Sequence, residues 1–372
     1  MNFAFSAPEE AFRAEVVELL ADYRELDGFF LQGQRWNEVR AFFRALGERG
    51  WLSLGWPAAE GGGKPPAFEY VLWDEAAYAR AARNPLASGI VAKTIARYGS
   101  PAQRQRWLPP IRSGELHFSL AYSEPEAGSD LASVRCRAER RGDVYVVTGQ
   151  KCWQSYAQDM DCLWTLCRTG TQESRGRGVS LLIIEKDTPG VSVRPLPMLD
   201  GDQLNEVIFE GAEIPVDQRI GPEDGAWTIL GEALADERHI QFPPKRVQRD
   251  LEDVVDWARA QGLDREPLAR RVLVDLAVQV REVEMHGLRV LDALQRGHSG
   301  AVEAAANKVA HTVVCQNIAR AALDLGGPAA LVRGARIELL WRQSLWETIG
   351  GGTSEIMRSV VARQGLGLGG RS

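Results

Sequence analysis

The hydrophobic period of this chain changes in its middle, and that change constrains the fold more than any other feature. Four short runs there are rich in β-branched and aromatic residues and are bounded by Gly, Pro, Asp or Asn. They cover 142–149, 161–168, 179–185 and 205–214. Because no helix-length segment separates these runs, the pattern favours a small antiparallel β domain over a parallel sheet with crossover helices.

Helical patterns lie on both sides of the β segment. Ser6 with Glu9 is a capping-box pattern, and Ser100 before Pro101 is a second helix-start signal. The N-terminal helices are expected over 7–26, 36–49 and 66–83, with another beginning at 101. The C-terminal helices are expected over 225–242, 247–261, 266–296, 301–325 and 334–347, with a short one after 353.

The fold class that follows is an α+β multi-domain chain. A length of 372 residues suggests two or three compact units. We expect an N-terminal all-α domain over 1–115, a middle antiparallel β domain over 116–222 and a C-terminal helical domain over 223–372.

Composition argues against several classes of function. The net charge of −6 does not suit a surface that coats nucleic acid. The five cysteines match no zinc spacing, so no metal site is expected. Their odd number does not suggest a disulfide framework, and a reducing compartment is therefore expected. No apolar run approaches the ~18 residues of a membrane span, and the N-terminus shows no signal-peptide pattern. A cytoplasmic protein without membrane or nucleic-acid partners is expected.

A segment rich in hydroxyls and glycines opens the β domain. This segment, AYSEPEAGSD, covers residues 121–130. Backbone N–H groups and serine hydroxyls in such a segment can bind an anion or a carbonyl-rich ring. On these residues alone, a structural turn explains the segment equally well.

Four motifs, in order, resemble the signatures of the acyl-CoA dehydrogenase family. They are residues 121–130, GQKCWQSYAQDMD at 149–161, LNEVIFEGAEIPVDQRIG at 204–221 and GGGTSEIMRSVVAR at 350–363. The resemblance covers nearly the whole chain and implies a C-terminal four-helix bundle, with FAD between the β domain and the bundle. It also implies the reaction, in which a glutamate removes the α proton of an acyl-CoA thioester and the β hydride passes to the flavin. The cofactor is needed because a side chain cannot accept hydride reversibly.

The resemblance assigns contacts residue by residue. The cofactor-binding positions that it implies are Leu120, Ser123, Gly128, Ser129, Trp153, Ser155, Thr353 and Glu355. Ser129 also matches a thioester-contacting position, and Arg238 matches a position near the CoA chain. Trp153 would pack on the flavin, and its structural alternative is a buried core aromatic. For Arg238 the alternative is a surface salt bridge.

The catalytic base departs from the commonest family pattern. Many members place a glutamate directly before the Gly-Thr of the last motif, where this chain has Gly351. Some members, which act on branched, long-chain or steroid side-chain thioesters, place it on the first helix after the β domain, and Glu237 falls at the matching position. Asp236 is the neighbouring alternative, because one residue turns a helix by ~100°. His239 is expected to be structural or solvated.

Two cofactor contacts also depart from the pattern. Many relatives carry an arginine before a Phe-Gly pair that reaches the FAD pyrophosphate of a neighbouring subunit, and 257–271 contains no such pair. Leu323 replaces a glutamine that holds the adenosine part in relatives. Arg270 and Arg271 are candidate substitutes. These departures leave open a homo-oligomer or a hetero-oligomer with a related chain, as in some steroid-catabolic relatives.

Three readings of the function follow from the resemblance. The leading one is an FAD-dependent acyl-CoA dehydrogenase of fatty acid or steroid degradation that desaturates a bulky, branched or long acyl group and passes electrons to an electron-transfer flavoprotein. The second is a non-catalytic or half-site subunit of a heteromeric dehydrogenase. The third is an oxidase-like or secondary-metabolism flavoenzyme.

Overall fold

The computed structural model describes residues 4–26, 35–81 and 87–369. The chain forms two compact units that are interleaved in sequence. The bundle unit comprises residues 1–24, 66–81 and 238–372, and the sheet unit comprises residues 25–65 and 82–237. The N-terminal helices are thus divided between the units by their contacts. The division at 115 and 222 stays an expectation from the sequence.

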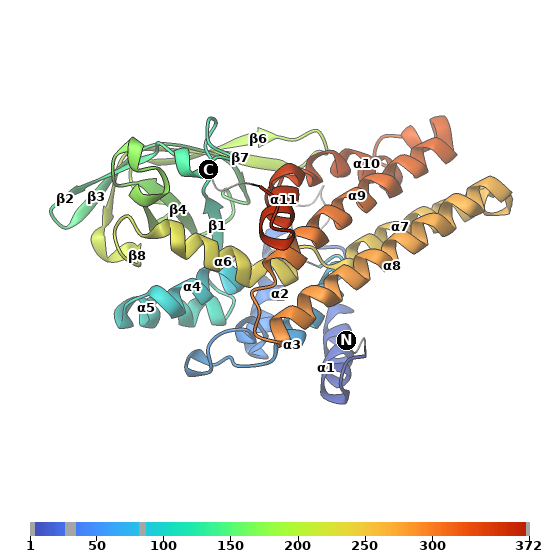
Figure 1. The fold of residues 1–372 in the computed structure, drawn as a ribbon, viewed down its shortest axis with the longest axis horizontal. Coiled ribbons are helices and arrows are strands. Elements are labelled where there is room, and N and C mark those ends of the chain that lie inside the picture. Colours follow the sequence, from blue (N-terminus) through green and yellow to red (C-terminus); the bar gives the residue numbers. More distant parts are fainter. Residues whose placement is uncertain (1–3, 27–34, 82–86, 370–372) are drawn as a thin grey trace. The chain divides into compact units, whose positions relative to one another are not determined.

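The sheet unit is built on one eight-stranded sheet with the order β6-β7-β3-β2-β4-β5-β8, to which β1 adds by pairing with β4 (Figure 1). The strands are β1 Phe118–Ala121, β2 Arg137–Arg141, β3 Val144–Ser155, β4 Cys162–Arg168, β5 Val179–Glu185, β6 Val191–Pro197, β7 Gln203–Pro215 and β8 Arg219–Ile220. Pairing is antiparallel except at β4, which pairs in parallel with β1 and, through one residue pair, with β2. All four strands expected from the sequence are present.

Strand β4 is buried along its whole length, because both faces of the sheet are covered there. Trp164 and Leu166 contribute to one hydrophobic cluster, and Leu163 and Cys167 contribute to the other. This alternation follows from the period of two in a strand. The helices of the sheet unit are α2 Trp36–Glu48, α4 Ala92–Tyr98, α5 Pro101–Arg112 and the beginning of α6 Ala226–Gln241. The last three of these helices also contribute side chains to the first cluster.

The bundle unit contains the expected four-helix core. Its helices are α7 Pro244–Ala260, α8 Pro267–Gln295, α9 Ala301–Gly326 and α10 Arg336–Glu347, and all four contribute to one hydrophobic cluster. In Figure 1, α7 and α8 form a long hairpin. The remaining helices of the unit are α1 Ala7–Leu20, α3 Pro66–Tyr78, the end of α6 and α11 Ser354–Val360. No helix in the described ranges is long and apolar enough to cross a membrane.

Helix α3 ends at Tyr78, before the expected end at 83. The early end of α3 results from contacts with another helix rather than from its own sequence. Arg80 has a left-handed backbone with a φ of 52°, which cannot continue a helix. Its guanidinium donates to Asp250, at 3.1 Å, and to Asp253, both on α7. Residues 82 and 83, the expected end of this helix, lie outside the described ranges.

Candidate active site

The residues singled out from the sequence fall into two sets, one in each compact unit. The sheet unit holds Leu120, Ser123, Gly128, Ser129, Trp153 and Ser155, and the bundle unit holds Thr353 and Glu355. Helix α6 contains the boundary between the units, because Glu237 is the last residue of the sheet unit and Arg238 is the first of this segment of the bundle unit.

The first two sequence motifs meet at the end of strand β3. The Cys152 N–H donates to the Ser123 carbonyl at 3.0 Å. The Ser119 hydroxyl donates to the Ser155 carbonyl at 2.8 Å, which ties β1 to the last residue of β3. Leu120 is half-buried against the first hydrophobic cluster. The structure therefore brings Leu120, Ser123 and Ser155 into one neighbourhood.

A buried ion pair, which the sequence did not reveal, holds the loop of the first motif. Lys151 Nζ lies 2.8 Å from Glu124 Oε1 and donates to the Tyr122 carbonyl at 3.0 Å. The two carboxylate oxygens of Glu124 also accept the backbone N–H groups of Arg135, at 2.7 Å, and Cys136, at 2.9 Å. With these partners the buried charges are satisfied, as burial of charge requires. The pair fixes the start and the end of the loop to strand β3.

Trp153 is the most unusual residue of this region. It occupies a β-bulge, because Cys152 pairs with Glu206 and Gln154 pairs with Asn205 while Trp153 has no partner across the ladder. Its φ is 72°, in a region that non-glycine residues rarely adopt, and its side chain is 55% exposed. A strained backbone that presents a large exposed indole is typical of a ligand contact. This exposure argues against the alternative of a buried core aromatic.

The end of the first motif is open to solvent. Gly128 and Ser129 are exposed, and no atom lies within 4 Å of a Cβ built at Gly128. Asp130 accepts a hydrogen bond from Arg175 Nη2 at 2.6 Å, which links this loop to the loop that follows β4. Space beside a glycine at such a position allows a ligand to approach the backbone closely.

In the bundle unit, Thr353 caps helix α11. Its hydroxyl accepts the Ile356 N–H at 3.2 Å, and Glu355 is exposed in the first turn. The loop before the cap contains Gly351, which has a φ of 65°. A Cβ at Gly351 would lie 3.0 Å from both Gln241 Nε2 and Phe242 Cζ. The end of α6 therefore fills the space that a side chain at 351 would use.

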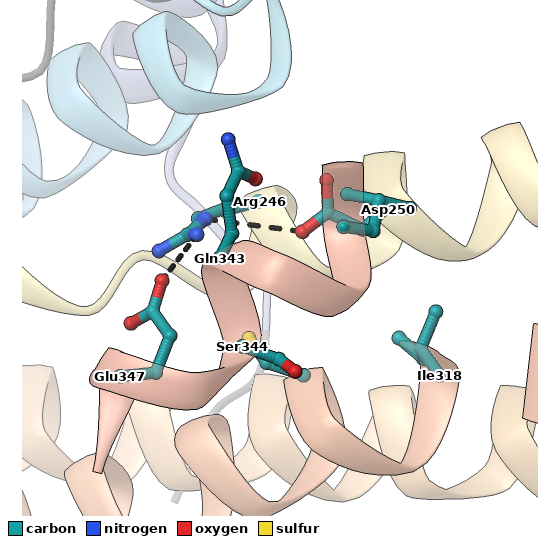
Figure 2. A pocket seen from close by; sticks show the side chains of 8 residues that line it. Arg246, Asp250, Ile318, Gln343, Ser344 and Glu347 are labelled. Atoms are coloured by element: carbon teal, nitrogen blue, oxygen red, sulfur yellow. Dashed lines mark ion pairs between the residues drawn. The ribbon is translucent and has the colours of Figure 1, made fainter. Parts of the chain in front are cut away.

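An ion-paired arginine anchors this loop from the other side. Figure 2 shows Arg246 of α7 between Asp250 and Glu347 in a small pocket, with Gln343 and Ser344 beside it. Arg246 pairs with Glu347, the last residue of α10, and its Nε lies 3.8 Å from Asp250. Burial alone lowers the pKa of Arg246, but Glu347 and the other nearby acidic groups raise it overall. The end of α10, from which the glycine loop leaves, is thereby held against α7.

Helix α6 carries the candidate bases. Asp236, Glu237 and Arg238 are helical, and their side chains lie outside the described part of the chain. His239 is buried, with Nε2 3.0 Å from Glu69 Oε2. This contact gives His239 a structural role, as expected. Arg270 and Arg271 are exposed at the beginning of α8, and Leu323 packs against the bundle core.

Comparisons with known proteins identify the family. Three family models match the chain: the N-terminal domain of acyl-CoA dehydrogenase over residues 6–115, the middle domain over 119–212 and the C-terminal domain over 226–366. The chain therefore belongs to the acyl-CoA dehydrogenase family and is an oxidoreductase that acts on acyl-CoA. This family is known to use FAD.

Individual relatives narrow the class. The chain is 34% identical to acyl-CoA dehydrogenase FadE26 of Mycobacterium tuberculosis, over 89% of this chain and 88% of that protein. Among solved structures it is similar to the Tcur3481–Tcur3483 steroid ACAD, with a TM-score of 0.91, 30% identity and full coverage of both chains. It is also similar to the ChsE4–ChsE5 complex from Mycobacterium tuberculosis, with a TM-score of 0.88, 32% identity and full coverage of both. The proteins to which the chain is similar thus include an acyl-CoA dehydrogenase of Mycobacterium tuberculosis and one that is described as a steroid ACAD.

Proposed function

We propose that this protein desaturates a bulky acyl-CoA thioester with Glu237 as the base that removes the α proton. The observation that carries this assignment is the packing at Gly351. In many relatives the base stands at the position of Gly351, and here the end of α6 fills that space with Gln241 and Phe242. Gln241 and Glu237 are four residues apart on one helix, so both residues belong to the same helix face.

The same helical period distinguishes the two neighbouring carboxylates. Asp236 lies four residues before Ile240, which is buried, and therefore belongs to the face of Ile240. Glu237 belongs instead to the face of Gln241, which meets the glycine loop. A general base must reach the proton that it removes, and geometry selects among candidates before acidity does. The face of Gln241 therefore favours Glu237 over Asp236.

FAD, when bound, supplies the acceptor for the β hydride. The chain's own residues would hold it through the exposed indole of Trp153, the backbone and hydroxyls at Ser123, Ser129 and Ser155, and the capped start of α11 at Thr353. The observation that fits a flat aromatic ring system is the exposed indole, because offset stacking with a second ring is favourable. Leu120 of β1 would contact the flavin from the same side as Ser123 and Ser155. Glu355, in the first turn of α11, would lie near the FAD together with Thr353.

The solved structures to which this chain is similar include one described as a steroid ACAD, which favours a wide acyl group. We propose a branched, long or polycyclic acyl thioester as substrate, with an electron-transfer flavoprotein as electron acceptor. Arg238 would contact the CoA chain. A second copy of this chain or a paired, related chain would complete the cofactor site, in place of the missing Phe-Gly arginine.

The test of the base is the Glu237→Gln variant, with Asp236→Asn as the matched control. Loss of a general base reduces turnover by about 10²–10⁴-fold, so we expect kcat to fall by about a thousandfold for Glu237→Gln and to change little for Asp236→Asn. FAD content should stay the same in both. The substrates are straight-chain, branched and steroid side-chain CoA thioesters. Unchanged turnover by Glu237→Gln would reject the assignment, and a large loss in Asp236→Asn alone would transfer it to Asp236.

A second candidate function is a half-site subunit that needs a partner chain. The departures at 257–271 and Leu323 favour it. The visible absorption spectrum of the chain purified alone separates the two. Flavin bands at near one FAD per chain support a self-sufficient enzyme, whereas a folded colourless protein supports the heteromeric complex. Peroxide formation that matches substrate consumption would instead indicate an oxidase.

A further inference from the structure

The last residue of strand β4 is a buried arginine whose hydrogen bonds go to backbone carbonyls. Arg168 is 2% exposed. Its Nε donates to the Val134 carbonyl at 3.1 Å, and its Nη2 donates to the Ala132 carbonyl at 2.8 Å. Its Nη1 donates to the carbonyls of Thr171, at 3.4 Å, and of Arg175. Within the described ranges, no carboxylate lies at ion-pair distance from it.

These four carbonyls belong to two different loops. Ala132 and Val134 lie in the loop that joins β1 to β2, residues 122–136, which we name the signature loop. The other two carbonyls lie in the loop that joins β4 to β5, residues 169–178. Two side-chain bonds reinforce the junction: Arg175 to Asp130 at 2.6 Å and Gln172 Nε2 to the Ser133 carbonyl at 3.0 Å. Arg168 therefore joins the two loops from their buried side.

The outer side of the signature loop carries the residues proposed to meet the ligand. Gly128 and Ser129 are exposed and directly precede the segment 130–134 that Arg168 and its neighbours hold. At its other side the loop is fixed by the Lys151–Glu124 pair. The segment between these two anchors contains the thioester-contacting position, so its place depends on both.

We propose that Arg168 is a positioning residue that sets the place of Ser129 at the substrate thioester. This inference rests on the proposed function, which assigns Ser129 to the thioester. An arginine suits the role because its planar fork has five N–H donors that point in several directions at once. It also remains charged when buried, and hydrogen bonds from a charged donor are roughly twice as strong as neutral ones. A lysine, with donors on one nitrogen, cannot reach both loops in the same way.

The experiment compares Arg168→Lys with the wild-type protein, as the full chain with any partner chain that it requires. Losing about one charged hydrogen bond corresponds to roughly a tenfold effect, so we expect KM for an acyl-CoA thioester to rise about tenfold while kcat stays within about twofold. The same rise is expected for the acyl-pantetheine thioester, which lacks the nucleotide. Gln172→Ala removes one bond of the same junction and should raise KM by a smaller factor. Arg141→Gln, an exposed arginine of β2, is the control and should leave KM unchanged.

Each outcome decides the proposal. A lower melting temperature with unchanged KM in folded Arg168→Lys would show a structural role only and reject it. A rise for acyl-CoA but not for acyl-pantetheine would place the effect at the nucleotide end and also reject it. If the wild-type protein turns over no thioester, the proposed function fails on its own. The junction is then tested by amide hydrogen exchange, which should become faster in 128–134 in Arg168→Lys and remain unchanged in β7.

Discussion

The ammonium group of Lys151 lies 2.8 Å from the carboxylate of Glu124, and both side chains are buried. The pair joins strand β3 to the loop of the first motif, 27 residues earlier in the chain. Lysine in a strand usually presents its charge to solvent. Here the charge of Lys151 is buried and paired with Glu124, and the position of the loop that carries Ser129 depends on this ion pair.

Replacing Lys151 with Met should leave the Glu124 carboxylate buried without its cation. Breaking a buried pair on one side costs about 3–5 kcal/mol, so we expect a lower free energy of unfolding in urea and a lower FAD content. The double variant Lys151→Met, Glu124→Gln should recover part of the stability, because no charge is then left unpaired. Arg141→Gln, an exposed arginine, is the control. A melting temperature for Lys151→Met equal to that of the wild type would contradict the structural role of the pair.

Replacing Trp153 with Gly should separate folding from cofactor binding. Glycine adopts the observed φ of 72° without strain, so the chain should be as stable as the wild type or more stable. Loss of the indole should weaken FAD binding about tenfold or more, since aromatic pairs contribute about 0.5–1.5 kcal/mol beyond the area that they bury. Trp153→Phe should retain most of the affinity. A titration with FAD, monitored by flavin fluorescence, measures the FAD affinity of both variants. Equal affinity in the wild type and Trp153→Gly would remove Trp153 from the cofactor site.

Restoring a glutamate at position 351 should fail to restore the family's common base. A side chain there needs a left-handed backbone, at roughly 1–2 kcal/mol, and would press on Phe242 and Gln241. We expect Gly351→Glu to lower the melting temperature and to leave the inactive Glu237→Gln variant inactive. Gly351→Ala carries the backbone cost and the contact of the Cβ alone, so its difference from Gly351→Glu measures the effect of the rest of the glutamate side chain. Turnover regained in the double variant Glu237→Gln, Gly351→Glu would show that this space can still admit a base.

His117 should make the sheet unit sensitive to acid. Burial, with the nearby charge of Arg40, lowers the pKa of His117 from 6.5 to about 4. Between these values the unfolded chain binds a proton that the folded chain does not, so stability is present above pH 6.5 and is lost as the pH falls toward 4. The loss is at most about 3 kcal/mol at 1.36 kcal/mol for each pKa unit. His117 packs edge-on against the rings of Trp36 and Phe43, and Phe can take its place there.

Urea unfolding at pH 7 and pH 5 tests this expectation. The wild type should lose more stability between the two values than His117→Phe does. His298→Phe, at an exposed position, should behave as the wild type. The same pH dependence in His117→Phe and the wild type would assign the acid sensitivity to other groups.

The sequence predicted the starts of most helices closely, because caps and periodicity are local signals. It missed α4, and α1 ends at Leu20, before the expected end at 26. Helix α5 begins at Pro101 after its capping Ser100, as expected, and α9 ends at Gly326 against an expected 325. Strands β2 and β6 were not expected. The first is an almost wholly charged segment with one buried alanine, Ala138, and the second contains two prolines. Their pairing comes from neighbouring strands rather than from their own composition.

The candidate site was predicted less completely, for a physical reason. Trp153 came from the resemblance to a family, and the bulge and positive φ that expose it are properties of the β3–β7 pairing. Lys151 and Arg168 look like ordinary surface charges in the sequence. Their burial depends on Glu124 and on carbonyls 34 and 36 residues away, which no local pattern contains. The role of Glu237 remains a prediction.

The packing at Gly351 has a consequence for how such a protein can evolve. The glycine has a left-handed backbone, and the side chains of Phe242 and Gln241 lie beside it, so a single substitution to a glutamate at this position would strain the backbone and displace both neighbours. On the proposed assignment of the base to Glu237, this cost would keep the base on α6, and descendants of this chain would vary their substrates without relocating it.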